Sequence, residues 1–405
     1  MKILLVNKFH YKKGGSETYY FTLAETFKSL GHDVIYFAMQ DEKNYQCDQE
    51  KYFVSNSNMN GGLKSKLNMV LHIAYSKEAY KKIKALCKEE KPDLIILNLV
   101  HKQITCSIID AIKEVLPKTK IVWTMHDLIA ICPSYTMLDG NGNICEKCIH
   151  GDFSNCFKNK CIHGSKIMSY LSTYEAKQIK KNGWYDKVDL YIAPSKFYQQ
   201  KLQQSKFTKS PIIYLANPLS ENQSFKKSDS IKDYVLYFGR LAKEKGVLTL
   251  IKAVRKNKKH LIILGTGPIE EELKIYIKKE NIENQVEMLG FKSGNELENY
   301  ISQAKVVVLP SEWYENGPYS AMEAMAHGKP LIVSNLGGLP ELVEIKKNGF
   351  MFNAGDVDDL ANKLNLIYDL NENEYSQFED YSINKAKTLF DARKYVENLL
   401  KEVSK

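Results

Sequence analysis

The 405 residues are more than one hydrophobic core usually organises, so two domains are expected. The 44% apolar and 26% charged content is that of an ordinary globular protein and excludes a disordered or fibrous chain. The net charge of +9 is uneven: residues 1–216 carry 31 lysines and no arginine against 20 acids, whereas residues 217–405 carry 26 basic against 28 acidic residues. This asymmetry favours an anionic partner for the first half, although a lysine-rich solvated surface explains it equally well.

No apolar run approaches the roughly 20 residues that a membrane-spanning helix needs. The N-terminal stretch "MKILLVNKF" is too short for the apolar region of a signal peptide and soon becomes polar, so it predicts a first strand. A cytosolic protein is therefore expected.

Short apolar runs rich in Val, Ile and Leu alternate with helix-length segments along the whole chain. Such runs predict parallel sheets covered by helices on both faces, and two series of them predict two doubly wound α/β domains. The expected strands are "KILLV", "DVIYFA", "DLIILN", "KIVWTM", "VDLYIA" and "PIIYLA" in the first half, then "YVLYFG", "HLIILG", "QVEMLG", "AKVVVLP" and "PLIVS".

A polar, serine-rich stretch without helical period separates the two series and reads as a linker. The expected organisation is a first domain at 1–216 with a cysteine-rich insertion at 132–163, a linker at 217–233, a second domain at 234–374, and an amphipathic C-terminal helix at 375–405 that packs back on the first domain.

The first strand is followed by "NKFHYKKGGSETYY", in which Gly14 and Gly15 open a helix. Glycines let a backbone approach a ligand, and the N–H groups of a helix N-terminus suit phosphate oxygens. Glycine pairs before helices are also common without function, so both interpretations remain open at Gly15.

His126 and Asp127 follow the strand "KIVW" and lie where a parallel sheet binds its ligands. His126 is a candidate for contact with substrate, while a hydrogen-bonded structural histidine is the alternative.

A long loop, "CPSYTMLDGNGNICEKCIHGDFSNCFKNKC", follows directly. Cys145 and Cys148 have the Cys-x2-Cys spacing of a zinc half-site, and Cys156 and Cys161 complete a set of four. Clustered cysteines in a reducing compartment favour a structural zinc site over disulfides. Free thiols, or an iron–sulfur or redox role, are the alternatives, because the second spacing fits no standard zinc ribbon.

In the second half, "YFGRLAKEKG" places Arg240 and Lys245 directly after a strand. Two such cations can hold a diphosphate, the arginine as a fork and the lysine as a point charge, although a solvated turn is the alternative. "GTGP" follows with Gly265 in a second strand-to-helix turn, which is ambiguous in the same way as the first.

The stretch "LPSEWYENGPYSAMEAMAHGKP" places Glu315 on a loop and Glu323 within the next helix. Pro318 is expected at the first position of that helix. Carboxylates in these places can accept hydrogen bonds from the hydroxyls of an extended polyol, whereas two solvent-facing glutamates are the plain alternative.

Together these motifs give the chain a family resemblance. It resembles the GT-B glycosyltransferases of family four, which are retaining and use nucleotide-sugars. The motifs that carry the resemblance span nearly the whole chain, and the last is the most specific: "GGSE", "GHDVIYF", "HD", "APS", "FGRLAKEKG", "GTGP", "LGF" and "LPSEWYENGPYSAMEAMAHGKPLIVSNLGGLPELV".

The resemblance implies two Rossmann-like domains facing across a cleft, a UDP- or GDP-sugar as donor, and no catalytic metal. It implies that Arg240 and Lys245 hold the donor diphosphate and that Glu323 holds the ribose. His126 and Glu315 would contact the transferred sugar and carry the catalysis. The remaining donor-binding residues implied by the resemblance are Gly15, Gly265, Phe291, Asn316, Gly317, Pro318, Tyr319 and Ser320.

The function expected from the resemblance is retaining transfer of a sugar to a glycan or lipid-linked acceptor in cell-envelope or capsular polysaccharide synthesis. An anionic membrane at the inner face is a candidate peripheral partner, with the helical stretch Ser65–Glu90 as candidate contact. Two alternatives remain: a nucleotide-sugar epimerase on the same fold, and a nucleic-acid-binding protein with a zinc knob. The second is disfavoured because residues 1–216 contain no arginine, so no nucleic acid is expected as partner.

Overall fold

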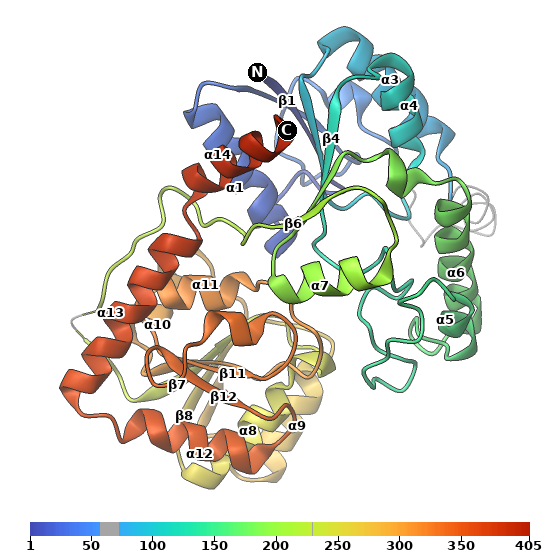
Figure 1. Ribbon diagram of the computed structural model, residues 1–405. Helices are drawn as coiled ribbons and strands as arrows, with labels where there is room; N and C mark the ends of the chain where they lie inside the picture. Colours follow the sequence, from blue (N-terminus) through green and yellow to red (C-terminus); the bar gives the residue numbers. More distant parts are fainter. Residues whose placement is uncertain (57–72, 229) are drawn as a thin grey trace. The chain divides into compact units, whose positions relative to one another are not determined.

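The computed structural model describes residues 1–56, 73–228 and 230–405, which form two α/β units (Figure 1). The first unit comprises Met1–Glu221 together with Ala392–Lys405, and the second comprises Asn222–Asp391. Each unit is built around one six-stranded sheet whose paired strands all run parallel. The predicted α/β class with two doubly wound domains is therefore confirmed.

The sheet of the first unit has the strand order β2-β1-β3-β4-β5-β6. Its strands are β1 (Lys2–Val6), β2 (Asp33–Phe37), β3 (Leu94–Leu97), β4 (Lys120–Thr124), β5 (Leu190–Ala193) and β6 (Ile212–Tyr214). Its helices are α1 (Gly15–Ser29), α3 (Lys77–Glu90), α4 (Ser107–Val115), α5 (Ser154–Lys158), α6 (Lys166–Lys181), α7 (Lys196–Ser205) and α14 (Ala392–Val403), with short 3₁₀ turns η1 (Glu50–Tyr52) and η2 (Trp184–Lys187).

The sheet of the second unit has the order β12-β11-β10-β7-β8-β9. Its strands are β7 (Tyr234–Phe238), β8 (His260–Leu264), β9 (Val286–Met288), β10 (Val306–Leu309), β11 (Leu331–Ser334) and β12 (Gly349–Phe352). Its helices are α8 (Val247–Asn257), α9 (Glu270–Lys279), α10 (Gly294–Gln303), α11 (Tyr319–Ala326), α12 (Val357–Tyr368) and α13 (Glu372–Leu389), with 3₁₀ turns η3 (Lys243–Lys245) and η4 (Leu339–Leu342).

The strands form where the sequence has continuous branched apolar runs. In β1, Ile3, Leu4, Leu5 and Val6 are all fully buried, as expected of a parallel strand covered on both faces. All eleven predicted strands are present. The sequence did not predict β12, "GFMF", because it begins with glycine and lacks the Val and Ile that mark the others.

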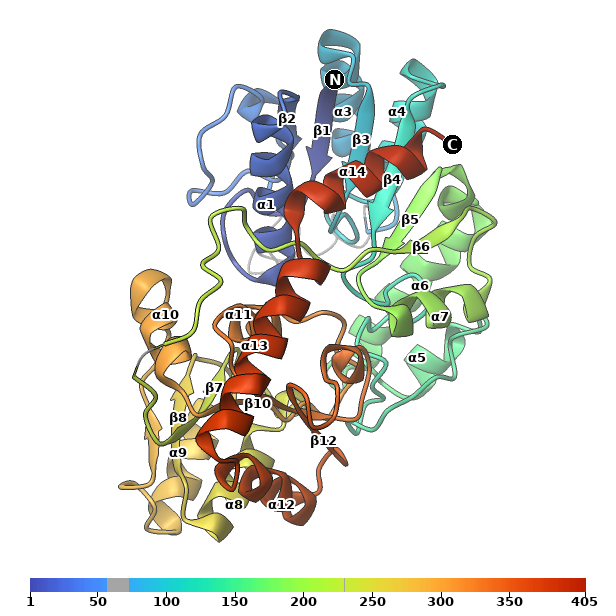
Figure 2. The ribbon, with the colours of Figure 1, turned by 60° about the vertical axis from the view of Figure 1, so that its left-hand side comes forward.

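The C-terminal region differs from the single helix predicted at 375–405. It forms two helices that meet at Phe390 and Asp391, and only the second belongs to the first unit. There α14 packs on α1, as Figure 2 shows, and the hydroxyls of Tyr19 and Tyr395 lie 2.7 Å apart. The preceding α13 packs on α11 in the second unit, where the buried Lys329 ammonium lies 3.4 Å from Glu379.

Each sheet has one place where the strand order reverses, and ligands of doubly wound sheets bind beyond the carboxyl ends of the strands at that place. In the first unit the reversal lies between β1 and β3, and in the second between β7 and β10. These two switch points are where functional side chains are expected.

None of the helices in the described part of the chain is both long and apolar enough to cross a membrane. Of the stretch Ser65–Glu90, predicted as a helix, Lys77–Glu90 forms α3, and residues 65–72 lie outside the described residues.

Candidate functional site

The loops after β7 and β10 lie in close backbone contact at the switch point of the second unit. The amide of Glu312 donates to the carbonyl of Glu244 at 2.8 Å. Gly246 has a φ of +65°, and a Cβ at this position would lie 1.9 Å from the carbonyl oxygen of Pro310. A residue with a side chain would therefore push the two loops apart, which explains the glycine after Lys245.

These loops bring Lys245 and Glu315 together, seventy residues apart in sequence. The Lys245 ammonium lies 2.5 Å from Glu315 Oε1 and 4.9 Å from the ring centre of Trp313. The Ser311 hydroxyl donates to the same carboxylate oxygen at 2.7 Å. Glu315 is only 6% exposed, so these partners compensate the desolvation of a buried charge.

The pKa of Glu315 reflects this balance. Burial by itself raises the pKa of the carboxyl, but the charge and hydrogen bond of Lys245 and the bond from Ser311 lower it below its ordinary value. Glu315 is therefore ionised at neutral pH and is held in one place by its partners.

Arg240 lies at the same edge of the sheet, just after β7. Its guanidinium pairs with Glu244, and its carbonyl accepts a hydrogen bond from the Tyr237 hydroxyl at 2.9 Å. The Arg240 side chain is more than half exposed, so its planar fork remains accessible to an anionic ligand.

The loop after β11 supports Glu315 from behind. Gly338 N–H donates to the Glu315 carbonyl at 2.7 Å. Gly337 has a φ of +64°, and a Cβ there would lie 2.5 Å from the Glu315 nitrogen. The glycine pair in "SNLGGLPELV" thus permits the close approach that fixes the backbone of Glu315.

Helix α11 begins one residue later than predicted: Pro318 is the N-cap, and Tyr319 is the first helical residue. The segment from Asn316 to Ser320 therefore runs from the Glu315 loop into the first turn. Glu323 follows in the second turn, where burial, and then the charge of Glu298, raises the pKa of its carboxyl to about 7. The two predicted glutamates thus have opposite shifts in pKa.

Gly265 and Phe291 lie at the ends of the neighbouring strands β8 and β9. Gly265 has a φ of +136°, and its N–H donates to the carbonyl of Gly290 at 2.7 Å. Phe291 is 73% exposed, which is unusual for a phenylalanine and leaves its ring accessible to a flat partner.

In the first unit, Gly15 is the first residue of α1. The buried Glu17 in that first turn accepts hydrogen bonds from the Asn7 amide and the Ser16 hydroxyl, both at 3.1 Å. These bonds anchor the N-terminus of α1 beside the end of β1, so Gly15 lies at the switch point of the first unit.

His126 follows β4. Its Nε2 lies 2.9 Å from Asn98 Oδ1, and its ring packs edge-on against Tyr19 with 4.8 Å between centres. Because Oδ1 only accepts, Nε2 is the protonated nitrogen. Burial lowers the pKa of His126 to about 3, so the imidazole is neutral at physiological pH. It can orient a substrate as a neutral hydrogen-bonding group, but it is not a reservoir of positive charge.

The zinc site of the cysteine-rich insertion stays a prediction, and its four cysteines lie near one another: Cys148 interacts electrostatically with Cys145 and Cys161, and Cys161 interacts with Cys156. Over residues 1–56, 73–228 and 230–405 there is no group of three or more His, Cys, Asp or Glu side chains that could hold a metal ion. Cys148 and Cys156 are buried in a small apolar cluster with Phe153, and Cys161 packs against it. All eight cysteines are free thiols. In this insertion the half-buried and buried thiols contribute to apolar packing, which cysteine readily does.

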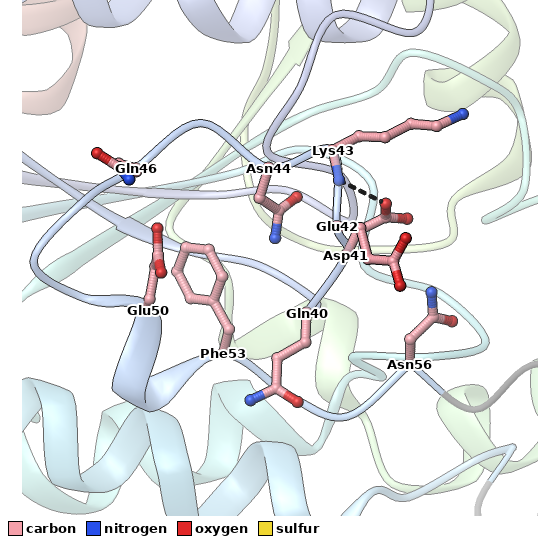
Figure 3. Close-up of a pocket in the computed structure, with 9 residues that line it drawn as sticks. All are labelled: Gln40, Asp41, Glu42, Lys43, Asn44, Gln46, Glu50, Phe53 and Asn56. Carbon is pink, nitrogen blue, oxygen red and sulfur yellow. Dashed lines mark hydrogen bonds between the residues drawn. The ribbon is translucent and has the colours of Figure 1, made fainter.

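A polar hollow of about 810 Å³ lies beside the end of β2 in the first unit (Figure 3). Carboxylates, amides and the ring edge of Phe53 line it, with the Lys43 amide donating to Asp41 at 3.0 Å. It contains none of the predicted site residues. Its donors and acceptors are of the kinds that bind sugar hydroxyls.

Sequence reasoning did not single out several residues of these sites. Ser311 and Trp313 lie within the motif that carries Glu315, and only the fold shows that they contact the Lys245–Glu315 pair. Lys8, in the quoted stretch after the first strand, and Lys102, after β3, were not recognised as neighbours because they lie 94 residues apart. Their electrostatic interaction is evident only in the folded unit.

The two halves of the chain match two related families. Residues 13–222 match glycosyltransferase family 4, and residues 220–385 match the glycosyl transferases group 1. Two doubly wound units with charged residues at their switch points define the GT-B class of protein, as the resemblance of the sequence predicted. The chain belongs to glycosyltransferase family 4.

Individual proteins show the same relationship. An uncharacterised glycosyltransferase of Methanocaldococcus jannaschii is 30% identical, over 60% of this chain and 62% of its own length. The amylovoran biosynthesis glycosyltransferase AmsK of Erwinia amylovora is 34% identical, over 31% of this chain and 34% of its own. The chain thus matches less than two thirds of either relative. Among solved structures, Anabaena HepE in complex with UDP covers 100% of both chains at 19% identity with a TM-score of 0.69, which shows the shared fold.

Proposed function

We propose that this protein is a retaining glycosyltransferase that moves a sugar from a nucleotide-sugar donor to a glycan or lipid-linked acceptor in cell-envelope or capsular polysaccharide synthesis. The observation that carries the proposal is the Lys245–Glu315 pair at the switch point of the second unit of a family 4 chain. The name of the amylovoran relative and the UDP bound to HepE support the polysaccharide product and the nucleotide-sugar donor.

The second unit supplies the donor contacts in this proposal. As the bond between sugar and diphosphate breaks, negative charge grows on the diphosphate, and Arg240 and Lys245 stabilise it. Glu323 accepts hydrogen bonds from the ribose hydroxyls. The exposed ring of Phe291 lies against the base, and Gly265 leaves room for the donor at the end of β8.

The transferred sugar lies against Glu315 and the backbone of Asn316, Gly317, Pro318, Tyr319 and Ser320. The anomeric carbon becomes cationic in the transition state, and an ionised carboxylate fixed by Lys245 and Ser311 stabilises positive charge without having to reorganise. In the first unit, the neutral His126 is the proposed hydrogen-bonding group for a sugar, and Gly15 is the residue proposed to border a diphosphate. The anomeric configuration is kept, and the reaction needs no divalent metal.

The acceptor binds to the first unit. The polar hollow at the end of β2 accommodates its sugar, since carboxylates such as Asp41 and amides such as Gln40 exchange hydrogen bonds with hydroxyls. The backbone of this loop is tied to the loop after β1 through the bond from Tyr45 N–H to the His10 carbonyl at 3.0 Å.

An anionic membrane is the proposed peripheral partner, and the cytoplasmic side is the proposed location. The surface that combines exposed apolar side chains with lysines is the outer side of α5 and α6, which lie side by side in Figure 1. We call it the α6 face. Its members are Phe157, Lys158, Lys166, Ile167, Tyr170, Tyr174, Lys177 and Lys181, all exposed. An exposed apolar stripe flanked by lysines matches the interface of an anionic bilayer. The α6 face is a second candidate contact beside Ser65–Glu90, of which residues 65–72 lie outside the described residues.

Donor turnover tests the proposed function. Purified protein is incubated with UDP-, GDP- and ADP-sugars, and free nucleotide is measured with and without acceptor extract. We expect nucleotide release with one base and a loss of about a hundredfold or more in Lys245→Ala and Arg240→Ala, because each removes a donor to the leaving group. Interconversion of the donor sugar without nucleotide release would indicate an epimerase instead.

Lys243→Ala is the matched control, since Lys243 is an exposed lysine in the same turn as Lys245. It should retain full turnover. Unchanged turnover in folded Arg240→Ala would contradict the assignment of the diphosphate site.

A further inference from the structure

Three lysines gather around the switch point of the first unit. Lys8 follows the end of β1, Lys102 follows β3, and Lys13 precedes α1. Because β1 and β3 are the strands between which the order reverses, their carboxyl ends border the place where a doubly wound sheet binds its ligand. This site belongs to the first unit, and its three lysines are not among the proposed donor contacts.

Each of the three ammonium groups lies close to an aromatic ring. Lys8 Nζ and Lys13 Nζ lie 5.6 Å and 3.8 Å from the ring centre of Phe9, and Lys102 Nζ lies 5.8 Å from that of Tyr135. Within the described parts of the chain, none of the three forms an ion pair. Burial, and then repulsion from Lys102 and Lys13, lowers the pKa of Lys8 to about 8. Like charges are thus crowded and lack a direct counter-ion.

The loop after β3 is held in an uncommon conformation that presents Lys102. Lys102 and Thr105 have φ values of +72° and +68°, which residues with a Cβ seldom adopt. The Lys102 N–H donates to the buried Glu175 carboxylate at 2.8 Å, and Thr105 N–H donates to the Val100 carbonyl at 2.7 Å. A strained loop that is fixed by such bonds is typical of a binding site, where the surrounding structure maintains the strain.

Three carboxylates, Glu17, Asp127 and Glu175, and one histidine also lie near the lysines. Burial raises the pKa of Glu175 to about 7 and raises the pKa of Asp127, while burial lowers the pKa of His101 to about 3. The histidine is neutral, and among the described residues none of these carboxylates forms an ion pair with the three lysines. The three ammonium groups therefore have carboxylates nearby but no direct counter-ion among the described residues.

We propose that Lys8, Lys13 and Lys102 bind a phosphate or diphosphate group carried by the acceptor. A doubly or triply charged group is the partner that three crowded ammonium ions favour. The proposal rests on the proposed function in taking the ligand to be the acceptor. It assigns the acceptor to the phosphorylated class, either a sugar phosphate or a lipid-linked diphosphate.

Calorimetric titration of the full chain tests the site. The probes are inorganic pyrophosphate and farnesyl diphosphate, each titrated with and without saturating UDP so that the donor site is filled in one arm. We expect both probes to bind in both arms and to lose about tenfold or more in affinity in Lys8→Gln/Lys13→Gln/Lys102→Gln, because three charge-assisted contacts are removed. The triple arginine variant should restore binding.

The matched control is Lys81→Gln/Lys88→Gln/Lys209→Gln, which removes the same charge from exposed positions of the same unit. It should bind the probes like the wild type. Equal affinities in the two triple glutamine variants would overturn the proposal, as would loss of probe binding on addition of UDP. Tighter binding of farnesyl diphosphate than of pyrophosphate supports a lipid-linked acceptor, and equal binding supports a sugar phosphate.

Failure of the lysine site can be distinguished from failure of the proposed donor site. If UDP failed to bind the wild type, the donor assignment would fail, whereas the titrations without UDP would still decide the lysine site. Thermal unfolding of both triple variants shows whether they are folded.

Discussion

Glu315 and Glu323 show how far environment separates two identical side chains. Glu315 is buried beside Lys245, and the pKa of its carboxyl is low, whereas Glu323 has no cation partner among the causes of its shift, and burial and Glu298 raise its pKa to about 7. Pairs of carboxyls with opposite shifts are common where one carboxyl must remain ionised. The sequence identified both residues, but only their surroundings distinguish them.

The raised pKa of Glu323 predicts a pH-dependent donor affinity. An ionised carboxylate accepts hydrogen bonds from ribose hydroxyls better than a carboxylic acid does, so UDP should bind more tightly as the pH rises from 6 to 8 and the affinity should then level off. Glu323→Gln should bind UDP more weakly at pH 8 and should lose this dependence. Calorimetric titration at several pH values measures it.

The same raised pKa predicts that the stability of the fold depends on pH in the direction opposite to UDP binding. A carboxyl whose pKa is raised in the folded state destabilises the fold progressively as the pH rises from its unfolded pKa of 4.5 toward 7. Glu323→Gln should therefore raise the Tm by a few degrees (about 2–4 °C) at pH 8 and leave it unchanged near pH 4. A lower Tm with weaker UDP binding would mean that the variant simply damages the fold.

At the scale of elements, short loops at the carboxyl ends of strands position the site. The loops after β7, β10 and β11 approach within backbone contact, which Gly246 and Gly337 permit. The sequence predicted these strands and the glycine turns between them, because periodicity and turn residues are local signals. It did not predict which loops touch.

Gly337→Ala tests whether the loop after β11 supports Glu315. The added Cβ would lie 2.3 Å from the Glu315 carbonyl oxygen, so we expect the carboxylate to be displaced and nucleotide release to fall about a hundredfold or more. Gly355→Ala is the matched control, since Gly355 also has a positive φ, +78°, but no atom lies within 4 Å of a Cβ there. Both variants carry the same backbone strain, and equal activities would contradict the supporting role.

At the scale of the whole molecule, charge is divided between the two halves of the chain. The lysine excess of residues 1–216 includes the proposed phosphate site and the α6 face, whereas residues 217–405 are nearly neutral. In the α6 face, Ile167 is 74% exposed and Tyr170 is 56% exposed, and the only acid of the helix, Glu175, is buried. Exposed apolar side chains of this size indicate an interaction surface.

Vesicle sedimentation tests the membrane proposal. The wild type should bind phosphatidylcholine vesicles that contain phosphatidylglycerol, and less so at high salt, while Ile167→Glu should bind about tenfold more weakly, because it introduces a charge into the apolar stripe. Ile275→Glu is the matched control, since Ile275 is 67% exposed on α9 of the other unit. Binding that does not depend on phosphatidylglycerol, or that is equally strong in the two variants, would refute the proposal.

The cysteine-rich insertion shows what spacing in sequence leaves open. Cys145 and Cys148 have the separation of a zinc half-site, yet Cys148 and Cys156 pack with Phe153 in an apolar cluster. A metal site needs side chains to converge in space, and short spacing in sequence ensures only that neighbouring residues are near.

The sequence by itself determined the α/β class, the eleven strands it marked with Val, Ile and Leu, and the family, because burial on both faces of a parallel sheet leaves a local and continuous apolar pattern. The tertiary structure decided the ion pair of Lys245 with Glu315, the convergence of Lys8, Lys13 and Lys102, and the return of α14 to the first unit. These contacts join residues far apart in the chain. Their formation depends on the order in which parallel strands pair, and crossover connections set that order without leaving a pattern in any one segment.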